Sequence, residues 1–388
     1  MLRDIIAKRE KELPIFTIGR FLQIAEERKD IISLGPGEPD FNAPKNVIAY
    51  AKKMLDKGYT HYSPVGGRTD LKKELVKKLK KENKIYCEEE NIIVTTGSTE
   101  GLLLGMLCTL DPGEACLVPD PGFLAYRPTV EILNALPLSY PLRQEDGFQL
   151  NVDEIEKQII PEKTKAIVLN TPSNPTGIVY SKKVLEEVAD LAVEHNLLVL
   201  CDEAYEALVY DDARHVSIGS FNGLEDRVIS FFSFSKTYAM PGFRLGYAVG
   251  PENIIEAMTK VHIFTSLCAP TISQVTAIEA LRHGKKSVEK MRNEYNKRRK
   301  FVIKRLNEIQ GLVCVEPKGA FYAFPNVASF GKKSLALSEY ILKKAKVAVI
   351  PGTEFGQNGE GFIRISYATK MHKIRIGLER IEGVLKRL

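Results

Sequence analysis

The stretch Ser233–Gly246 reads SFSKTYAMPGFRLG, and it begins where the apolar run Val228–Phe232 ends. An apolar run without alternating polar residues is typical of a strand buried on both faces of a parallel sheet. The chain then becomes polar and offers one amine, that of Lys236. Open α/β sheets bind their ligands at the carboxyl ends of their strands. This stretch therefore predicts both a sheet and a ligand site at the edge of that sheet.

Further apolar runs of the same kind lie along the chain, and helical patterns separate most of them. The seven predicted strands are Ile92–Thr96, Ala115–Val118, Leu136–Tyr140, Ala166–Asn170, Leu197–Asp202, Arg227–Phe232 and Leu245–Gly250. The predicted helices between them include Pro44–Lys57, Gly67–Glu82, Thr99–Leu110 and Ser181–His195. We therefore expect an α/β protein with a mostly parallel sheet of seven strands.

The length of 388 residues exceeds the roughly 250–300 residues at which one hydrophobic core stops growing, so two domains are expected. After the last strand of the sheet, a long charged helix is predicted over Lys285–Ile309. The segments beyond it predict strands at Val313–Val315, Phe321–Phe324, Val347–Ile350 and Phe362–Ser366, with helices at Ser334–Lys344 and Thr369–Leu385. This change of pattern favours a second, smaller α+β domain.

The composition, with 44% hydrophobic and 27% charged residues, excludes a fibrous or wholly disordered protein. The net charge of +6 comes with basic runs that carry apolar residues at helical spacing, which favours solvated helix faces over a nucleic-acid surface. The six cysteines show no C-x-x-C spacing, and the first ten residues are charged and lack the apolar core of a signal peptide. We expect free thiols, a cytoplasmic location and no membrane helix.

Several common motifs are missing from the sequence. The glycine fingerprints of dinucleotide sites and P-loops do not occur, and neither does a G-x-S-x-G elbow. The six histidines are scattered and form no H-E-x-x-H pair, so a metal site is not expected.

Polar segments follow four of the predicted strands: Thr96–Thr99, Asn170–Gly177, Cys201–Tyr205 and Ser233–Lys236. Taken singly, each has an ordinary interpretation as a turn, a helix cap or a solvated lysine. Together they bring an amine, a carboxylate, amide and phenol groups, and hydroxyls beside a helix N-terminus suited to a phosphate. A phosphate-bearing ring cofactor that reacts through an imine needs this combination.

The segment Ser233–Gly246 resembles the lysine signature of the class I and II aminotransferases, which are fold type I pyridoxal-phosphate enzymes. Four more segments match other signatures of this family, in the family's order: Ser33–Phe41, Asn170–Gly177, Asp202–Tyr205 and Phe362–Ala368. The resemblance extends from about residue 30 to the C-terminus. It implies the fold type I architecture with pyridoxal phosphate (PLP) as cofactor.

The same resemblance implies that the segments around Gly37 and Arg364 meet over the cofactor. Both ends of the chain would then contribute to the smaller domain. We expect a large PLP-binding domain of residues 45–280 and a small domain of residues 1–44 and 281–388.

Catalytic roles follow from the resemblance for three residues. Lys236 would bind PLP covalently and later move the proton between the substrate Cα and the cofactor. Asp202 would pair with the pyridine N–H and keep the ring cationic. Tyr205 would hydrogen-bond the ring's O3′ atom, together with Asn174.

The remaining cofactor contacts are also implied by the family's pattern. The phosphate would be held by the N–H groups of Ser98 and Thr99, the hydroxyls of Ser233 and Ser235, and Arg244. Phe123 would stack on the ring. Tyr62 would reach the phosphate of the neighbouring subunit, which makes the protein a homodimer.

For the substrate, the resemblance assigns the α-carboxylate to Arg364, assisted by Asn174 and the Gly37 N–H. Residues 15–18 and the loop around Phe264 are expected to line the side-chain pocket. Some bacterial aspartate aminotransferases carry a lysine at the position of Thr99 to bind the distal carboxylate of aspartate, and this chain lacks it.

We therefore expect an aminotransferase that moves an amino group from an amino acid, favoured to be aromatic, to a 2-oxo acid such as 2-oxoglutarate by a ping-pong mechanism. An aspartate or alanine aminotransferase and a Cβ lyase of the same fold are alternatives that the motifs do not separate. A PLP-sensing transcription regulator is disfavoured, because no helix-turn-helix pattern precedes the family motifs.

Overall fold

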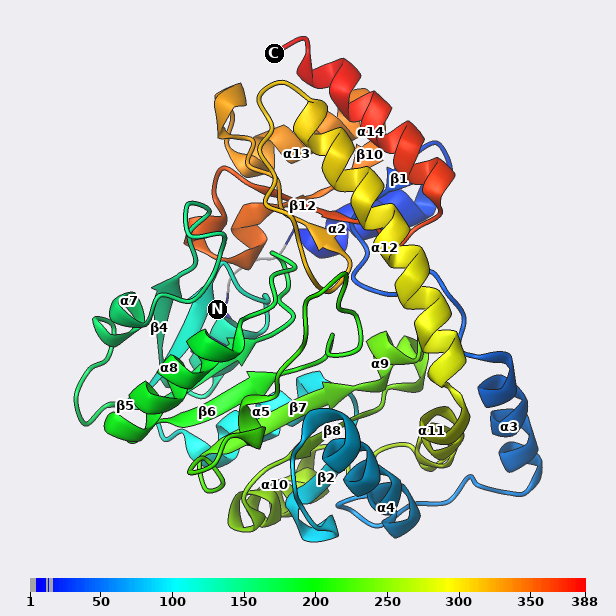
Figure 1. Cartoon of the computed structure of the whole chain (residues 1–388), viewed down its shortest axis with the longest axis vertical. Coiled ribbons are helices and arrows are strands. Elements are labelled where there is room, and N and C mark those ends of the chain that lie inside the picture. The colour runs from blue at the N-terminus through cyan, green and yellow to red at the C-terminus, as the bar shows by residue number, and fades with distance from the viewer. Residues whose placement is uncertain (1–4, 12, 14–16) are drawn as a thin grey trace.

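The computed structural model describes residues 5–11, 13 and 17–388. Figure 1 shows a large sheet with helices on both faces in the lower half and a smaller layered part above it. The long helix α12 (Lys285–Glu308) runs from the lower part to the upper one. The C-terminal helix α14 (Met371–Leu385) lies in the upper part, beside the N-terminal strand β1 (Ile32–Ser33).

The large sheet has seven strands in the order β2-β8-β7-β6-β5-β3-β4. All neighbouring pairs are parallel except those of β8, which is antiparallel to both β2 and β7. Each strand matches a predicted one. The observed bounds are β2 Ile92–Thr95, β3 Ala115–Asp120, β4 Leu136–Pro141, β5 Thr164–Asn170, β6 Leu198–Asp202, β7 Val228–Ser233 and β8 Gly246–Val249.

One property of these strands was predicted wrongly. Strand β4 lies at the edge of the sheet and is mostly only half-buried, whereas the apolar run Leu136–Tyr140 was expected to be buried on both faces. The edge position alone does not account for this exposure, because β2 at the opposite edge is buried throughout.

The predicted helices around the sheet are confirmed. They are α3 (Lys45–Asp56), α4 (Thr69–Lys78), α5 (Ser98–Thr109) and α8 (Lys182–Glu194). The predicted extension of α4 to Glu82 is a π-helical turn, Leu79–Asn83. Helix α8 is capped by Ser181, whose Oγ accepts a hydrogen bond of 3.3 Å from the Val184 N–H. Helices not predicted individually are α6 (Tyr126–Ile132), α7 (Val152–Glu156), α10 (Glu252–Thr265) and α11 (Thr271–His283).

The upper part contains a three-stranded antiparallel sheet, β11-β12-β9, covered by helices. Its elements are β9 (Tyr322–Ala323), α13 (Ser334–Ala345), β11 (Ile350–Pro351) and β12 (Ile363–Ser366). The predicted strand Val313–Val315 was wrong, because Val313 makes only an isolated bridge to Asn326. The predicted strand Val347–Ile350 is two short strands, β10 (Val347–Ala348) and β11, which belong to different sheets.

The two ends of the chain meet at strand β1. It pairs in parallel with β10, so that Ile32 lies opposite Val347. The Leu34 N–H then donates to the Ala348 carbonyl at 2.9 Å, and the Ser366 N–H donates to the Leu34 carbonyl at 2.7 Å. These bonds hold the loop after β1 against the end of strand β12.

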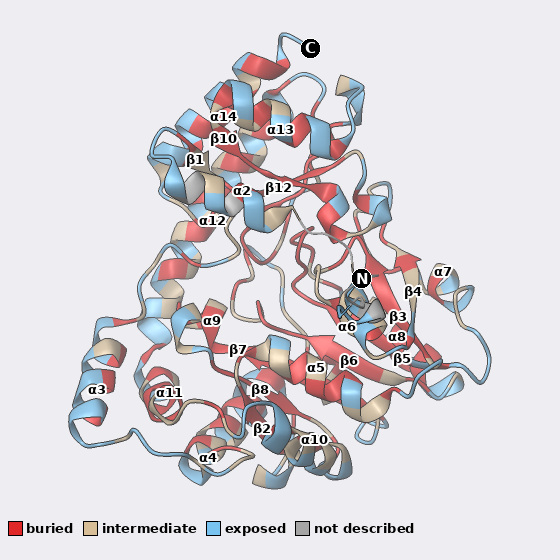
Figure 2. Ribbon diagram, turned by 180° about the vertical axis from the view of Figure 1, so that it is seen from behind, coloured by how far each residue is buried: buried red, intermediate tan, exposed pale blue. Residues whose placement is uncertain are grey.

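Buried apolar residues fill both parts, and Figure 2 shows them concentrated in the strands and the facing sides of the helices. One cluster joins the two parts, since it contains Leu117 and Leu169 of the large sheet as well as Phe324 and Phe355 of the upper part. Within the described residues, no helix combines the length and the apolar character that crossing a bilayer requires.

Candidate active site

A cavity of about 250 Å³ lies at the carboxyl ends of strands β5, β6 and β7. All the predicted site residues except Tyr62 line it. These are Gly37, Ser98, Thr99, Phe123, Asn174, Asp202, Tyr205, Ser233, Ser235, Lys236, Arg244 and Arg364. Sequence motifs that are up to 327 residues apart in the chain, from Gly37 to Arg364, are thus brought to one place.

Lys236 lies in the short helix α9 (Phe234–Thr237), which begins directly after strand β7. Its Nζ donates a hydrogen bond to the Gly37 carbonyl, which ties the loop after β1 to the rim of the sheet. Burial lowers the pKa of Lys236 to about 8 from the usual 10.5. At pH 7 roughly a tenth of such an amine is unprotonated and able to act as a nucleophile or base.

Asp202 is the last residue of strand β6, and its side chain is buried. Its Oδ2 accepts a hydrogen bond of 2.8 Å from the Tyr126 hydroxyl, and its Oδ1 accepts one of 3.1 Å from the Ala204 N–H. Burial raises the pKa of Asp202 to about 6 from 3.8, and the Tyr126 hydrogen bond opposes part of that rise. A cationic partner would offset the unfavourable burial of this carboxylate. The sequence analysis missed Tyr126, which lies three residues after Phe123.

The turn between β2 and α5 forms one end of the cavity. Gly97 has φ +86°, and a Cβ atom at this position would lie 2.6 Å from Arg244 Nη2. Ser98 begins helix α5, so the N–H groups of its first turn have no acceptor in a preceding turn. Ser233 and Ser235 line the same cavity, and the Ser233 hydroxyl accepts a hydrogen bond of 3.2 Å from the Ser235 N–H. Free N–H groups, hydroxyls and a guanidinium suit a phosphate dianion.

A partly buried carboxylate that binds this turn was not predicted. Glu100 Oε2 accepts hydrogen bonds of 2.6 Å from both the N–H and the hydroxyl of Thr96, and Oε1 accepts one from the Ser266 hydroxyl. Burial alone would raise the pKa of Glu100, but hydrogen bonds from His262, Ser266 and Thr96 lower it to about 2. Glu100 therefore fixes the turn to the end of helix α10.

Arg364, on strand β12, faces the cavity from the upper part. Its guanidinium lies between the rings of Tyr322 and Phe355, with its carbon 4.4 and 4.8 Å from the two ring centroids. Nη1 donates to Asn174 Oδ1 at 2.9 Å and Nη2 donates to the Gly35 carbonyl at 2.7 Å. The buried Nε has no partner among the described residues, so one N–H of this side chain is left for a ligand.

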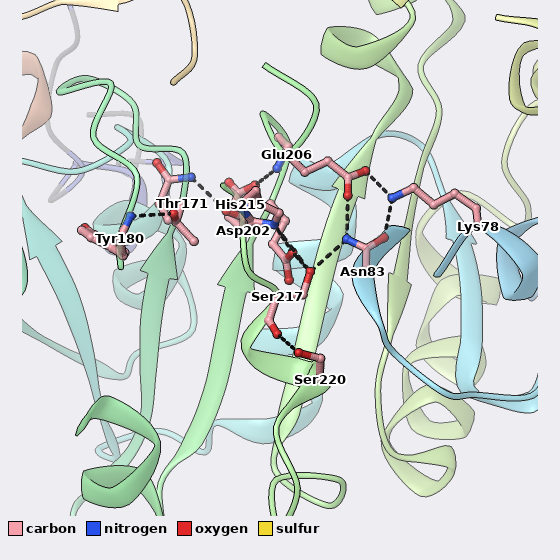
Figure 3. A network of polar contacts seen from close by, with 12 residues as sticks. Lys78, Asn83, Thr171, Tyr180, Asp202, Glu206, His215, Ser217 and Ser220 are labelled. Atoms are coloured by element: carbon pink, nitrogen blue, oxygen red, sulfur yellow. Dashed lines mark hydrogen bonds and ion pairs between the residues drawn. The ribbon is translucent and has the colours of Figure 1, made fainter. Parts of the chain in front are cut away.

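Behind Asp202 runs a buried polar network, drawn in Figure 3. Lys78 forms an ion pair with Glu206, and Asn83 donates to Glu206 at 2.7 Å and to Ser217 at 2.9 Å. Glu203, the residue after Asp202, accepts from Ser217 and pairs with His215 at 2.6 Å. Glu203, Glu206 and His215 lie close enough to hold a metal ion, but these ion pairs and hydrogen bonds already engage their side chains.

Comparison with known proteins gives the family. The model of the aminotransferase class I and II family matches residues 29–381. The chain belongs to this family. The enzyme is 47% identical over 372 residues to an aspartate aminotransferase of Pyrococcus abyssi, with 95% of both chains covered. It is 45% identical to an aromatic-amino-acid aminotransferase of Thermococcus litoralis, also with 95% coverage of both.

The solved structures agree with this assignment. The crystal structure of an aromatic aminotransferase from Pyrococcus horikoshii superposes with a TM-score of 0.90 at 47% identity, covering 95% of this chain and 99% of that one. An aspartate aminotransferase of Thermus thermophilus reaches a TM-score of 0.93 at 34% identity, covering 99% and 100%. The predicted fold type I architecture and the predicted aminotransferase activity are confirmed.

Class I and II aminotransferases depend on pyridoxal phosphate, which is therefore the cofactor of this enzyme. The cavity suits that molecule chemically: it has an amine of lowered pKa, a buried carboxylate that needs a cationic partner, and a turn with phosphate donors. The Gly97 turn also leaves no room for a side chain beside Arg244. The roles assigned to individual residues stay predictions.

Two of the predicted regions do not face this cavity within one chain. Tyr62 and Phe264 are each 83% exposed and lie outside it. Of residues 15–18, Ile18 lines the cavity, whereas 15 and 16 lie outside the described residues. The lining also includes Leu124, Asn170 and Tyr322, which sequence reasoning missed. Of these, Asn170 ends strand β5 within a segment that the motifs had already marked.

Proposed function

We propose that the enzyme transfers the amino group of an aromatic amino acid to a 2-oxo acid such as 2-oxoglutarate. The observation that carries the choice of donor is the side-chain wall of the cavity, which is apolar and aromatic: Ile18, Phe123, Leu124 and Tyr322. Among the described residues, the cations that line the cavity are Lys236, Arg244 and Arg364, and each has another assigned role. The lysine that would bind a distal carboxylate is replaced by Thr99.

In the proposed reaction, PLP supplies an aldehyde carbon that accepts the amino group and a cationic ring that withdraws electrons from the substrate Cα. Lys236 would hold the cofactor, and its free amine would move a proton from the substrate Cα as a general base. Its lowered pKa supports this role, because a protonated amine could not accept that proton. Asp202 would keep the ring nitrogen protonated, and Tyr205 and Asn174 would hold the ring oxygen.

Arg364 is proposed to fix the substrate α-carboxylate, with help from Asn174 and the Gly37 N–H. The unpartnered Nε supports this, since a buried donor without an acceptor is unfavourable until a ligand supplies one. The neighbouring rings of Tyr322 and Phe355 restrict the movement of the guanidinium. A donor bound there has its Cα held in a fixed orientation near Lys236.

A spectroscopic donor screen tests the proposed specificity. The holoenzyme would be mixed with phenylalanine, tyrosine, aspartate or alanine, and loss of the absorbance of the lysine-bound cofactor followed in single turnovers. We expect phenylalanine and tyrosine to react with the highest ratio of rate to half-saturating concentration. Faster conversion by aspartate would reject the aromatic assignment.

Changing Lys236 to Ala tests the catalytic assignment separately. We expect single turnovers to fall by at least about 10⁴-fold, because general base catalysis alone contributes about 10²–10⁴ and the covalent link is lost as well. Circular dichroism and the melting temperature should stay close to those of the unchanged enzyme. Retained transamination would show that another group moves the proton.

We also propose that the enzyme is a homodimer with the large domain formed by residues 45–280 and the small domain by residues 1–44 and 281–388. The exposure of the large aromatic side chains of Tyr62 and Phe264 supports a covering partner subunit. All six cysteines are free, which supports the proposed cytoplasmic location.

A further inference from the structure

Glu354 is a buried carboxylate that binds a segment 336 to 337 residues away in the sequence. Its side chain is close to the cavity but does not line it. Oε1 accepts hydrogen bonds from the Thr17 N–H at 2.9 Å and the Thr17 hydroxyl at 2.6 Å. Oε2 accepts the Ile18 N–H at 3.0 Å. Both carboxylate oxygens are thus used on one short stretch of backbone.

That stretch is the beginning of helix α2 (Ile18–Glu27). The helix has no side-chain cap of its own, since the Thr17 hydroxyl is donated to Glu354 instead of accepting from the first turn. The first N–H groups of a helix lack acceptors within the helix, and a negative charge beside them is favourable. Glu354 supplies both the acceptor and the charge from the other end of the chain.

The segment that carries Glu354 is itself firmly held. The Phe355 carbonyl accepts a hydrogen bond of 2.8 Å from the Gly122 N–H, and the Asp120 carboxylate accepts from the Gln357 and Asn358 N–H groups at 3.2 and 3.0 Å. Phe355 also lies against the guanidinium of Arg364. Glu354 is therefore fixed relative to the arginine proposed to bind the substrate carboxylate.

The first residue of α2, Ile18, lines the cavity together with Lys236 and Arg364. We propose that Glu354 is a positioning residue that sets the place of Ile18, so that this side chain forms a wall of the substrate side-chain pocket. Phe21 adds a buried apolar contact one turn later, but it leaves the first turn of the helix without acceptors. The proposal rests on the proposed substrate site, because Ile18 faces that cavity.

A consequence for kinetics follows from this arrangement. If the contact is weakened, Ile18 occupies its wall position for only a fraction of the time, and the apparent affinity for substrate falls by that fraction. The groups that react, Lys236 and Asp202, do not contact Glu354. The change should therefore appear in KM and leave kcat almost unaltered, and it should be larger for a donor whose side chain extends farther from Cα.

The experiment compares Glu354→Gln, Thr17→Val and the control Glu339→Gln in the holoenzyme. Glutamine keeps the size of the side chain but loses its charge, and valine removes only the hydroxyl donor. Glu339, on α13, forms an ion pair with Arg20 of helix α2, with Arg20 Nη1 at 3.4 Å from Glu339 Oε1. The pair is exposed, since the side chains of Arg20 and Glu339 are 68% and 49% exposed. Such pairs contribute little, so this control should behave like the unchanged enzyme.

Two measurements are made on each variant: amide hydrogen exchange of peptides covering residues 17–27, and kcat and KM for phenylalanine and alanine. For Glu354→Gln we expect faster exchange in α2 but not in strand β5, and a KM for phenylalanine raised about tenfold with kcat within about twofold. The KM for alanine should rise less. Thr17→Val should change both readouts in the same direction by a smaller factor.

Unchanged exchange in α2 for both Glu354→Gln and Thr17→Val would overturn the proposal. Faster exchange with an unaltered KM would also overturn it, since Glu354 would then anchor the helix without shaping the pocket. If amide hydrogens of the Glu354→Gln variant exchange faster throughout the molecule, the whole fold is destabilised in that variant. The proposal is then judged on the Thr17→Val variant alone, by the same two criteria. A wrong assignment of the donor can be told apart from a wrong role for Glu354. It would reverse the ranking of donors in the unchanged enzyme, and it would leave the hydrogen-exchange result as expected.

Discussion

At the scale of single residues, burial moves the two titratable groups at the centre of the cavity in opposite directions. The pKa of Asp202 is raised to about 6 and that of Lys236 is lowered to about 8. Both shifts favour the neutral form, because charge is less stable away from water. The apoenzyme therefore stores unfavourable electrostatic energy at these positions, which binding of a cationic ring beside Asp202 would relieve.

The raised pKa of Asp202 predicts how the stability of the apoenzyme depends on pH. Between about pH 4 and pH 6 the unfolded chain loses the Asp202 proton while the folded chain keeps it, so the free energy of unfolding falls as the pH rises. The pKa of Asp202 is 3.8 in the unfolded chain and about 6 in the folded one, so over the whole transition the free energy of unfolding falls by about 3 kcal/mol.

The measurement compares the unchanged apoenzyme with Asp202→Asn by urea unfolding at pH 4, 5, 6 and 7. Asp202 affects the pKa of Lys236, Tyr126 and Cys201, but at pH 4 to 7 Lys236 is largely protonated and the other two groups are neutral. The difference in free energy between the two proteins therefore reports mainly on the Asp202 carboxylate. It should shift by about 2 kcal/mol in favour of the variant between pH 4 and pH 7, because part of the full change is already complete at pH 4. A difference that stays constant with pH would mean that Asp202 titrates normally.

Most of the predicted residues line the cavity, because the polar segments that follow the strands are recognisable in the sequence. Their individual roles stay predictions. Lys236, Asp202 and Arg364 each stand beside or within an apolar run whose pattern is legible without a structure. Tyr126 and Glu354 were not predicted, because their hydrogen-bond partners are distant in the sequence. No local pattern indicates a hydrogen bond that spans 76 or 337 residues.

At the scale of elements, the turn between β2 and α5 combines backbone geometry with the phosphate end of the cavity. Gly97 adopts a positive φ and packs directly against the Arg244 guanidinium. A residue with a Cβ atom would be strained there and would also displace a cation from the proposed phosphate site.

Gly97→Ala should therefore weaken PLP binding, and Gly113→Ala provides a matched control. Gly113 has φ +88°, almost the same as the +86° of Gly97, but a Cβ atom at Gly113 would meet nothing within 4 Å. Both variants place a side chain at positive φ, where backbone strain costs about 1–3 kcal/mol. We expect the Kd of the apoenzyme for PLP, followed by cofactor absorbance, to rise at least tenfold for Gly97→Ala only. Equal effects of the two variants would mean that the contact with Arg244 is unimportant.

Elements were predicted well where burial and length made the pattern strong. The seven strands of the large sheet are apolar runs of four to seven residues in the structure. Strands β1 and β10 have two residues each, which is too short for any periodicity to develop. Their pairing depends on the packing of the whole molecule.

At the scale of the whole molecule, the separation into two parts is incomplete, since one apolar cluster contains residues of both. The cavity lies between them, with Lys236 on one side and Arg364 on the other. Tyr62 is exposed in the single chain, and its predicted role requires a second subunit.

Mixed dimers test that role. We expect Tyr62→Ala and Lys236→Ala to be weakly active or inactive alone. In a refolded equimolar mixture, half of the dimers are mixed, and in each of these one site combines an intact Lys236 with an intact Tyr62 from the partner. Activity should recover to about a quarter of the unchanged enzyme.

The control mixture is Lys236→Ala with Asp202→Asn. These two residues line the same cavity of one chain, so both sites of a mixed dimer carry a defect. No recovery is expected from this mixture. Recovery in both mixtures, or in neither, would contradict a shared site that contains Tyr62.

The pairing of β1 with β10 also dictates an order of events during synthesis. Residues 32 and 33 leave the ribosome long before Val347 and Ala348, with which they form a sheet. At about 5–20 residues per second, the wait is roughly 15–60 s. The large sheet can assemble during that interval, whereas the loop that meets Lys236 and Arg364 cannot be docked. A nascent chain therefore remains without its substrate site until Val347 and Ala348 have been synthesised.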